Sequence, residues 1–136
     1  MLSTIGNKGF YIEPTLIKSK VDNHGVLYDE SEINKVKIIN EDTCKAIKNG
    51  LEKTVIDGTG VKAQSKLIEY CAKTATAQSG QYDENGEEIM YCWFAGFFPK
   101  ENPQYTICIM KENGSSGGSD CGPVFKEIAE NILLNF

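Results

Sequence analysis

Lys73, Thr74 and Thr76 stand together in a run of small and apolar residues that has the composition of a β-strand. A charged ammonium in a strand that is covered on at least one face needs an anionic or hydroxyl partner, because an unpaired buried charge is strongly unfavourable. The two threonines supply hydroxyl and backbone N–H groups beside the lysine. We therefore interpret these residues as a candidate carboxylate-binding group, in which the ammonium provides charge and the threonines provide direction.

A purely structural interpretation of the same residues stays open. A lysine can extend its ammonium from the edge of a sheet into water, and threonine is common in strands whatever their function. The local residues alone do not decide between the two interpretations.

Phosphate and dinucleotide binding lack the residues that they require. Tyr70, Cys71 and Ala72 precede Lys73, so the glycines of a phosphate-binding loop are missing. The segment Gly58-Thr59-Gly60 has neither the third glycine nor the preceding strand of a dinucleotide site. We interpret it as a helix end.

Metal and thiol chemistry are not expected either. His24 is the only histidine and falls in a predicted exposed turn. The five cysteines form no C-x-x-C pair and stand mostly within apolar runs, which predicts small buried side chains without a disulfide or zinc framework. They are Cys44, Cys71, Cys92, Cys108 and Cys121. We expect no metal and no cofactor.

The charge and hydropathy of the chain argue against two kinds of partner. A net charge of −5, with 14 scattered basic residues, argues against nucleic acid and against an anionic membrane surface. The longest apolar run, residues 89–98, has about half of the roughly 20 residues that a membrane helix needs. No secretory signal is visible, so we expect no membrane segment and no targeting signal in this chain.

The first forty residues predict short and irregular elements. Met1–Ile5 resembles the last turn of a helix. Phe10–Ile17 and Lys35–Ile39 are expected to be extended, and Asp22–Gly25 to form a hairpin turn.

A helix and a three-strand antiparallel meander are expected next. Asn40 is a suitable N-cap for an amphipathic helix that ends near Asp57. The three strand-like runs are Leu67–Ala77, Ile89–Phe98 and Tyr105–Met110. Their short connections indicate antiparallel neighbours, because a parallel crossover needs a dozen or more residues. The second and third runs are apolar at odd and even positions, so both faces should be covered.

A second amphipathic helix is expected at the end of the chain. A loop rich in glycine and serine, Asn113–Ser119, leads into it at Gly122-Pro123. Its predicted apolar stripe is Val124, Phe125, Ile128, Ala129, Ile132 and Leu133. We expect residues 1–136 to form a single unit of the α+β class, with the meander packed against a helix before it and a C-terminal helix after it.

Six motifs occur in one order along nearly the whole chain. They are Asn7-x-Gly9-(x)4-Pro14, Gly58-Thr59-Gly60, Lys73-Thr74-x-Thr76-Ala77-Gln78, Trp93-Phe94-Ala95-Gly96-Phe97-x-Pro99, Pro103-x-Tyr105 and Gly122-Pro123-Val124-Phe125-Lys126-Glu127-Ile128-Ala129. In this order the chain resembles the C-terminal part of the transpeptidase domain of class B penicillin-binding proteins, the division and sporulation type. The resemblance implies an incomplete penicillin-binding transpeptidase fold, which is β-lactamase-like.

The resemblance also implies a reaction and a role for each matching residue. The family transfers an acyl group from D-Ala-D-Ala stem peptides of peptidoglycan, and β-lactams acylate the same serine. Lys73 takes a supporting catalytic role, and Lys73, Thr74, Ala75 and Thr76 form the substrate-binding strand. The N–H of Thr76 supplies half of the oxyanion hole. Stem peptide or β-lactam is the implied partner of the complete domain, and the parent family is extracytoplasmic and anchored to the cell membrane.

The chain departs from the family pattern in two ways. No serine has lysine three residues later or asparagine two residues later, so the Ser-x-x-Lys nucleophile and the Ser-x-Asn partner are absent. The family sequence Gly-Lys-Thr-Gly is Ala72-Lys73-Thr74-Ala75 here, and the Ala75 methyl falls where the family keeps bare backbone near the ligand. We expect a fragment of a peptidoglycan transpeptidase that is not catalytic alone.

Two alternatives to an enzyme fragment stay open. One is a stand-alone, non-catalytic module that binds peptides or proteins with the same sheet, and the other is a generic α+β binding domain. An in-frame Ser-x-x-Lys and Ser-x-Asn before Met1 would support the fragment. In the family fold the third strand pairs with an upstream strand, so we expect an open sheet edge and a homo-oligomer, which light scattering would detect.

The missing nucleophile predicts that labelled penicillin leaves no covalent adduct on this chain. Incubation followed by intact mass measurement checks this. An adduct would show that a serine outside the family pattern is nucleophilic.

Overall fold

A computed structural model describes residues 1–29 and 34–135. The helices are α1 (Leu2–Gly6), α2 (Glu41–Ile56) and α3 (Gly122–Asn135), with short turns η1 (Val61–Ala63) and η2 (Gly117–Cys121). The strands are β1 (Phe10–Ile12), β2 (Ser19–Val21), β3 (Leu27–Asp29), β4 (Lys35–Lys37), β5 (Cys71–Tyr82), β6 (Glu88–Phe98) and β7 (Tyr105–Glu112). None of the helices in these described ranges is long and apolar enough to cross a membrane.

Helix α2 begins where the sequence predicts. The Asn40 side chain accepts a hydrogen bond from the backbone N–H of Thr43 at 2.7 Å, which satisfies one of the free donors at the helix start. Acidic side chains in its first turn complement the helix dipole. The helical spacing of Cys44, Ile47, Leu51 and Val55 predicts its apolar stripe. Three of these residues are buried, whereas Ile47 is 38% exposed.

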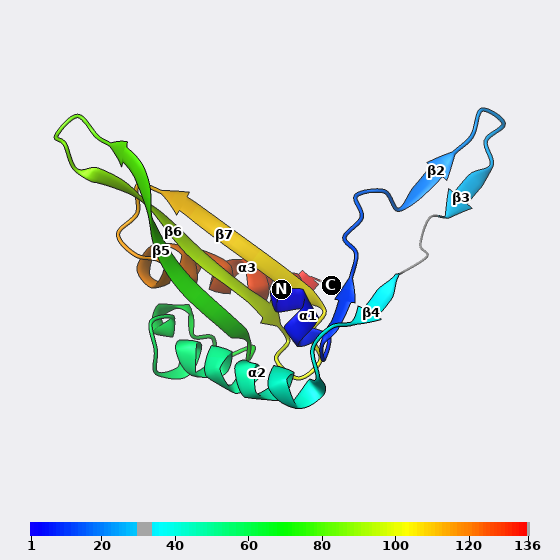
Figure 1. The fold of residues 1–136 in the computed structure, drawn as a ribbon, viewed down its shortest axis with the longest axis horizontal. Helices are drawn as coiled ribbons and strands as arrows, with labels where there is room; N and C mark the ends of the chain where they lie inside the picture. Colours follow the sequence, from blue (N-terminus) through cyan, green and yellow to red (C-terminus); the bar gives the residue numbers. More distant parts are fainter. Residues whose placement is uncertain (30–33, 136) are drawn as a thin grey trace.

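The three-strand meander is confirmed, in the order β5-β6-β7, with every pair antiparallel. The presence of this meander between two helices argues against the generic α+β alternative (Figure 1). The turn between β5 and β6 is closed by Asp83, whose carboxylate accepts backbone N–H bonds from Asn85 and Glu87 at 2.8 and 2.9 Å. Such local bonds between an aspartate and the following backbone favour a tight turn.

The limits of the first strand differ from the prediction of Leu67–Ala77. The strand begins at Cys71, because the Ser65 hydroxyl accepts bonds from the N–H groups of Leu67 and Ile68 and holds that segment in a turn. It continues to Tyr82, which pairs with Glu88, so half of the connection expected at 79–88 is strand and only residues 83–87 form the turn.

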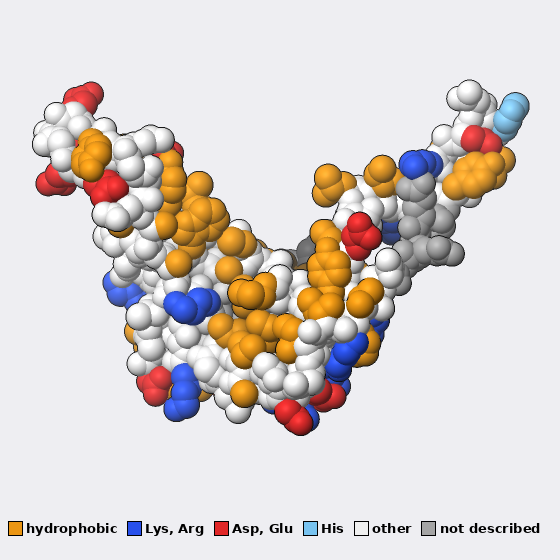
Figure 2. All heavy atoms as spheres, in the orientation of Figure 1, with side chains coloured by type: hydrophobic (Ala, Val, Ile, Leu, Met, Phe, Trp, Pro, Cys, Tyr) orange, Lys and Arg blue, Asp and Glu red, His pale blue; other side chains and the backbone are white. Residues whose placement is uncertain are grey.

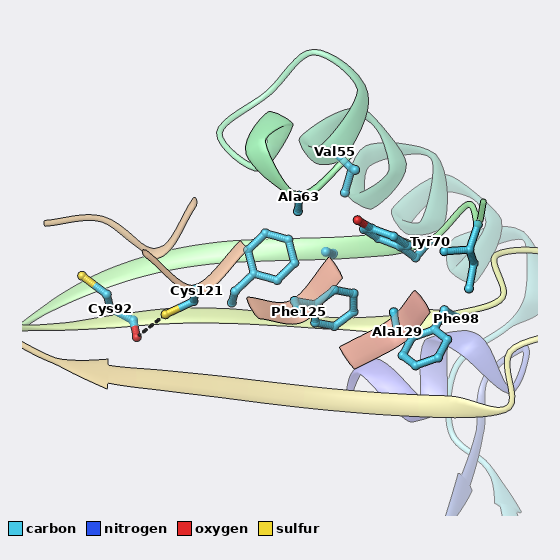
Figure 3. Packing of buried hydrophobic residues seen from close by; sticks show 11 residues of the cluster. Val55, Ala63, Tyr70, Cys92, Phe98, Cys121, Phe125 and Ala129 are labelled. Atoms are coloured by element: carbon cyan, nitrogen blue, oxygen red, sulfur yellow. Dashed lines mark hydrogen bonds between the residues drawn. The ribbon is translucent and has the colours of Figure 1, made fainter. Parts of the chain in front are cut away.

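The main core lies between the sheet and α3. Phe125 contacts Phe94, Phe98 and Tyr70, with ring centroids 5.0, 5.8 and 5.1 Å apart. Figure 3 shows Phe125 in the middle of this cluster, with Val55 and Ala63 above it, on the side of α2. Only part of the predicted stripe on α3 is buried, because Val124, Ile128 and Leu133 turn away from the sheet and are exposed.

The opposite face of the sheet is covered at one end only. There, Ile5 of α1 and Cys44 and Leu51 of α2 pack against Cys71 and Phe97. Figure 2 shows hydrophobic side chains gathered on the face that looks away from α3.

Further along this face the sheet carries no cover within the described part of the chain. Met110, which pairs with Trp93, is 48% exposed, and Cys108, which pairs with Ala95, is also exposed. The prediction that both faces are covered is therefore wrong here. The prediction of buried cysteines holds for four of the five and fails for Cys108.

Two small antiparallel sheets precede α2. Strand β1 pairs with β4, and β2 pairs with β3 to form an arm that projects from the body (Figure 1). The hairpin turn at residues 22–25 is confirmed, with the backbone N–H groups of His24 and Val26 bonded to the Asp22 carboxylate. The pairing of β1 with β4 was not predicted, because such short strands carry no sequence signal of their partner.

Phe125→Ala is expected to lower the free energy of unfolding by about 3–5 kcal/mol, because it leaves a cavity among three aromatic rings. Urea unfolding followed by circular dichroism measures this. Val124→Ala is the matched control, since Val124 is its neighbour and is 44% exposed, and it should change stability by no more than about 0.5 kcal/mol. Equal losses of unfolding free energy in the two variants would contradict the conclusion that Phe125 is the centre of the core.

Candidate functional site

The candidate site lies along β5, which forms one edge of the sheet. Lys73 pairs with Ala95 and Ala75 pairs with Trp93, so each of the two strands has an alanine beside the lysine. An edge strand exposes backbone N–H and C=O groups that can bind an extended peptide. The strand can therefore present side chains and backbone to a ligand together.

Lys73 is exposed, whereas Ala72 and Thr74 are buried, so β5 is covered on one face as expected and the lysine lies on the other face. Its ammonium Nζ donates to the backbone carbonyl of Thr74 at 2.6 Å. The face of the sheet around Lys73 is uncovered among the described residues, so the charge stays near water and needs no buried anion.

Thr74 lies on the opposite face of the strand and is only 8% exposed. Its hydroxyl Oγ1 is 2.6 Å from the Oγ1 of Thr59, which belongs to the loop between α2 and η1. Thr76, two residues further along the strand, is exposed. Lysine and threonines therefore serve opposite faces of one strand, because side chains alternate.

A cavity of about 320 Å³ adjoins the threonine face. Thr59 and β5 residues 74–76 line one side of it, and residues 116–118 line the other. Its walls thus carry several hydroxyl groups and two glycines. It is large enough to admit a carboxylate with a small alkyl group.

Gly117 and Gly118 approach the strands more closely than any other residue type could. A Cβ atom on Gly117 would lie 2.0 Å from the carbonyl oxygen of Trp93 and 2.7 Å from that of Ala75. A Cβ atom on Gly118 would lie 1.9 Å from the carbonyl oxygen of Thr59. The two glycines therefore bring η2, the loop of Thr59 and strand β5 into direct backbone contact.

Asp120 holds this glycine segment in place. Its carboxylate accepts bonds from the backbone N–H groups of Ser115 and Ser116 at 2.5 and 3.0 Å, and from the Ser115 hydroxyl at 3.1 Å. The ammonium of Lys111 lies 3.5 Å from its other oxygen. The backbone bonds from Ser116 and Ser115, followed by the smaller contributions of the Ser115 hydroxyl and Lys111, lower the pKa of Asp120 to about 2.

One side of this cavity was predicted from the sequence and the other was not. Lys73, Thr74, Ala75 and Thr76 were expected on one strand, and they lie there. Thr59 was expected at a helix end and residues 113–119 in an ordinary loop. The adjacent glycines were the available signal for a close approach, whereas nothing in the sequence indicates the contact between Thr59 and Thr74.

The rest of the described chain offers no metal centre. No three His, Cys, Asp or Glu side chains come together in residues 1–29 and 34–135 as a group that could hold a metal ion.

Acidification is expected to remove the stabilising contribution of Asp120. Its pKa is lower in the folded chain than the unfolded value of 3.8, so the contribution is fully present above about pH 4 and is lost as the pH falls toward 2. Asp120→Asn should therefore reduce the free energy of unfolding at pH 6, and the difference from wild type should shrink as the pH falls. Urea unfolding at a series of pH values measures this.

Glu84→Gln is the control for that experiment, since Glu84 is exposed in the turn between β5 and β6. It should show little difference at any pH. A difference between Asp120→Asn and wild type that stays constant from pH 6 to pH 2 would contradict the role of the charged carboxylate.

Comparison with known proteins agrees with the motifs. The profile of the penicillin binding protein transpeptidase domain family matches residues 1–130. The chain is 28% identical to penicillin-binding protein PbpB of Mycolicibacterium smegmatis over 98% of its own length and 23% of that protein. It is 29% identical to stage V sporulation protein D of Bacillus subtilis, over 97% of its own length and 21% of that protein. The chain thus spans less than a quarter of the length of these relatives.

Solved structures share the fold. The ampicillin complex of penicillin-binding protein 3 from Mycobacterium tuberculosis aligns with a TM-score of 0.81 at 26% identity, over 98% of this chain and 32% of that one. A peptidoglycan synthetase from Bifidobacterium adolescentis aligns with a TM-score of 0.84 at 24% identity, over 98% of this chain and 25% of that one. The chain belongs to the penicillin-binding protein transpeptidase domain family, of the class B division and sporulation type.

Proposed function

We propose that this chain supplies the substrate-binding strand of a peptidoglycan D,D-transpeptidase and contributes to acyl transfer without catalysing it alone. The observation that carries this proposal is the hydroxyl-lined cavity beside Lys73, Thr74, Ala75 and Thr76 at the open edge of β5. In this arrangement the terminal carboxylate of a D-Ala-D-Ala stem peptide occupies the cavity, and the peptide backbone runs along the strand edge.

The chemistry of the cavity suits a carboxylate. Thr76 is exposed, and within the described residues its hydroxyl makes no hydrogen bond that a ligand would have to displace. The hydroxyl can therefore donate to the anion. Hydrogen bonds to a charged group are stronger than those between neutral groups. The ammonium of Lys73 adds positive charge from the other face of the same strand. No described residue covers the lysine there, so a second group of the ligand can approach the ammonium.

Lys73 and Thr76 would have further roles in the acyl-transfer step. A serine outside this chain attacks the carbonyl of the D-Ala-D-Ala bond, the serine proton passes to the nitrogen of the terminal residue as the C–N bond breaks, and D-alanine leaves. Lys73 supports this proton transfer with its positive charge, and an amine of a second strand then takes the acyl group and releases the serine. The backbone N–H of Thr76 donates to the oxyanion as it forms, as one of the two donors that such a site requires. The second donor accompanies the nucleophile.

The solved relative that binds ampicillin supports the same ligand class for this strand. A penicillin carries a carboxylate and a reactive acyl group, as the stem peptide does. We extend the proposal to β-lactam binding in the complete domain, and to the outer side of the cell membrane as the location of the parent protein.

A non-catalytic module remains the second candidate, and Ala75 is the observation that favours it. Ala75 lines the cavity at the position where the family pattern has glycine, and its methyl group lies on the same face of the exposed strand as Lys73. A module of this kind would bind peptides through the same edge without acyl transfer. Self-association through the outer edge of β7 and the uncovered Trp93–Met110 face also stays a prediction.

Thr76→Val is expected to weaken binding of N-acetyl-D-Ala-D-Ala at least about tenfold, because valine keeps the shape of threonine and removes one hydrogen bond to the carboxylate. Titration of the isotope-labelled chain by NMR measures the dissociation constant and locates the shifts at residues 73–76. Thr106→Val is the control, since Thr106 is an exposed strand threonine on β7.

Ala75→Gly provides the opposite test in the same titration. Removal of the methyl group should tighten binding, because the ligand can then approach the backbone. Binding that is equal in wild type and Thr76→Val, or shifts confined to other elements, would contradict the proposed function.

A further inference from the structure

We propose that Thr59 is a positioning residue for the carboxylate: its hydroxyl donates a hydrogen bond to Thr74, and this directs the Thr74 proton toward the ligand. The inference rests on the proposed function, because it concerns the same cavity. It adds a residue from a different part of the chain, the loop between α2 and η1, to the determinants of specificity.

The hydroxyl groups of Thr59 and Thr74 are in close contact. The two Oγ1 atoms are 2.6 Å apart, a short distance for two hydroxyl groups, and Thr59 and Thr74 are 15 residues apart in sequence. The loop of Thr59 is itself fixed, because the N–H of Gly60 donates to the carbonyl of Thr54 at 2.8 Å and Gly118 lies against the carbonyl of Thr59. These backbone contacts therefore hold the Thr59 loop in place beside Thr74.

The number of protons in the pair limits its hydrogen-bond arrangements. Each threonine hydroxyl has one proton to donate and two lone pairs. In the pair, one proton lies between the two oxygens and the other is free for an outside acceptor. If Thr59 donates, the free proton belongs to Thr74, and if Thr74 donates, it belongs to Thr59.

The two hydroxyl groups lie in different environments. Thr59 is exposed, so water can serve its lone pairs, whereas Thr74 is 8% exposed and faces the cavity. A carboxylate in the cavity can only accept, so it favours the arrangement in which Thr74 donates to it and accepts from Thr59. Each bond in such a chain polarises the next, which strengthens the bond to the anion.

This hydrogen-bond arrangement has a consequence for ligand specificity. A ligand that ends in a carboxamide carries N–H donors, and it can bind Thr74 in either arrangement. Loss of the Thr59 hydroxyl should therefore weaken carboxylate binding more than carboxamide binding. A merely structural role for Thr59 would weaken both equally.

The experiment compares N-acetyl-D-Ala-D-Ala with its C-terminal amide by NMR titration of the full chain. In wild type the carboxylate should bind more tightly than the amide. Thr59→Val should reduce this ratio of affinities about three- to tenfold, as expected for one hydrogen bond. Thr59→Ser keeps the hydroxyl and should restore the ratio.

A double-mutant cycle tests whether Thr59 acts through Thr74. In the background of Thr74→Val, the change Thr59→Val should have no further effect on the ratio. An unchanged ratio in Thr59→Val, or an equal further loss in the Thr74→Val background, would overturn the inference.

The outcomes also separate this inference from the proposed function. If Thr76→Val weakens binding while Thr59→Val leaves the ratio unchanged, the proposed function stands and only the role of Thr59 fails. If the wild-type chain binds neither ligand at residues 73–76, the proposed function fails and the inference fails with it.

Discussion

Phe125 is fully buried where helix α3, strand β6 and the segment before β5 meet. The site depends on the packing of this side chain. Its ring packs against Phe94, Phe98 and Tyr70 at centroid distances of 5.0–5.8 Å. This packing holds the start of α3 against the sheet, and η2 leads directly into that helix. Because interiors are close-packed, the position of α3 sets the position of Gly117 and Gly118 against the strands.

The cavity follows from that contact and from the alternation of side chains along β5. The glycines bring η2 against the backbone of β5, β6 and the Thr59 loop, and the Asp120 carboxylate holds the turn that leads into them. Along β5 the lysine points to the uncovered face and Thr74 to the cavity. One strand therefore offers charge on one face, hydroxyl groups on the other, and free backbone at its edge. These three features together suit an extended peptide that ends in a carboxylate.

Local sequence signals predicted the elements whose structure is decided locally. The Asn40 cap and the stripe of Cys44, Ile47, Leu51 and Val55 predicted helix α2 within one residue of its limits. Short connections between apolar runs gave the antiparallel meander. The predictions failed where a distant or less regular contact decides the outcome: the Ser65 turn delays β5, and an uncovered face leaves Cys108 and Met110 exposed.

The sequence by itself determined the family, the order of helices and strands, and the strand that carries Lys73, Thr74 and Thr76. These follow from motif order, hydrophobic periodicity and capping, all of which act between near neighbours in the chain. Only the tertiary structure decided that Thr59 meets Thr74, that Gly117 and Gly118 close the cavity, and that the lysine and the threonines face opposite ways. Those contacts join segments brought together by core packing, and the residue types involved carry no local signal of their partners.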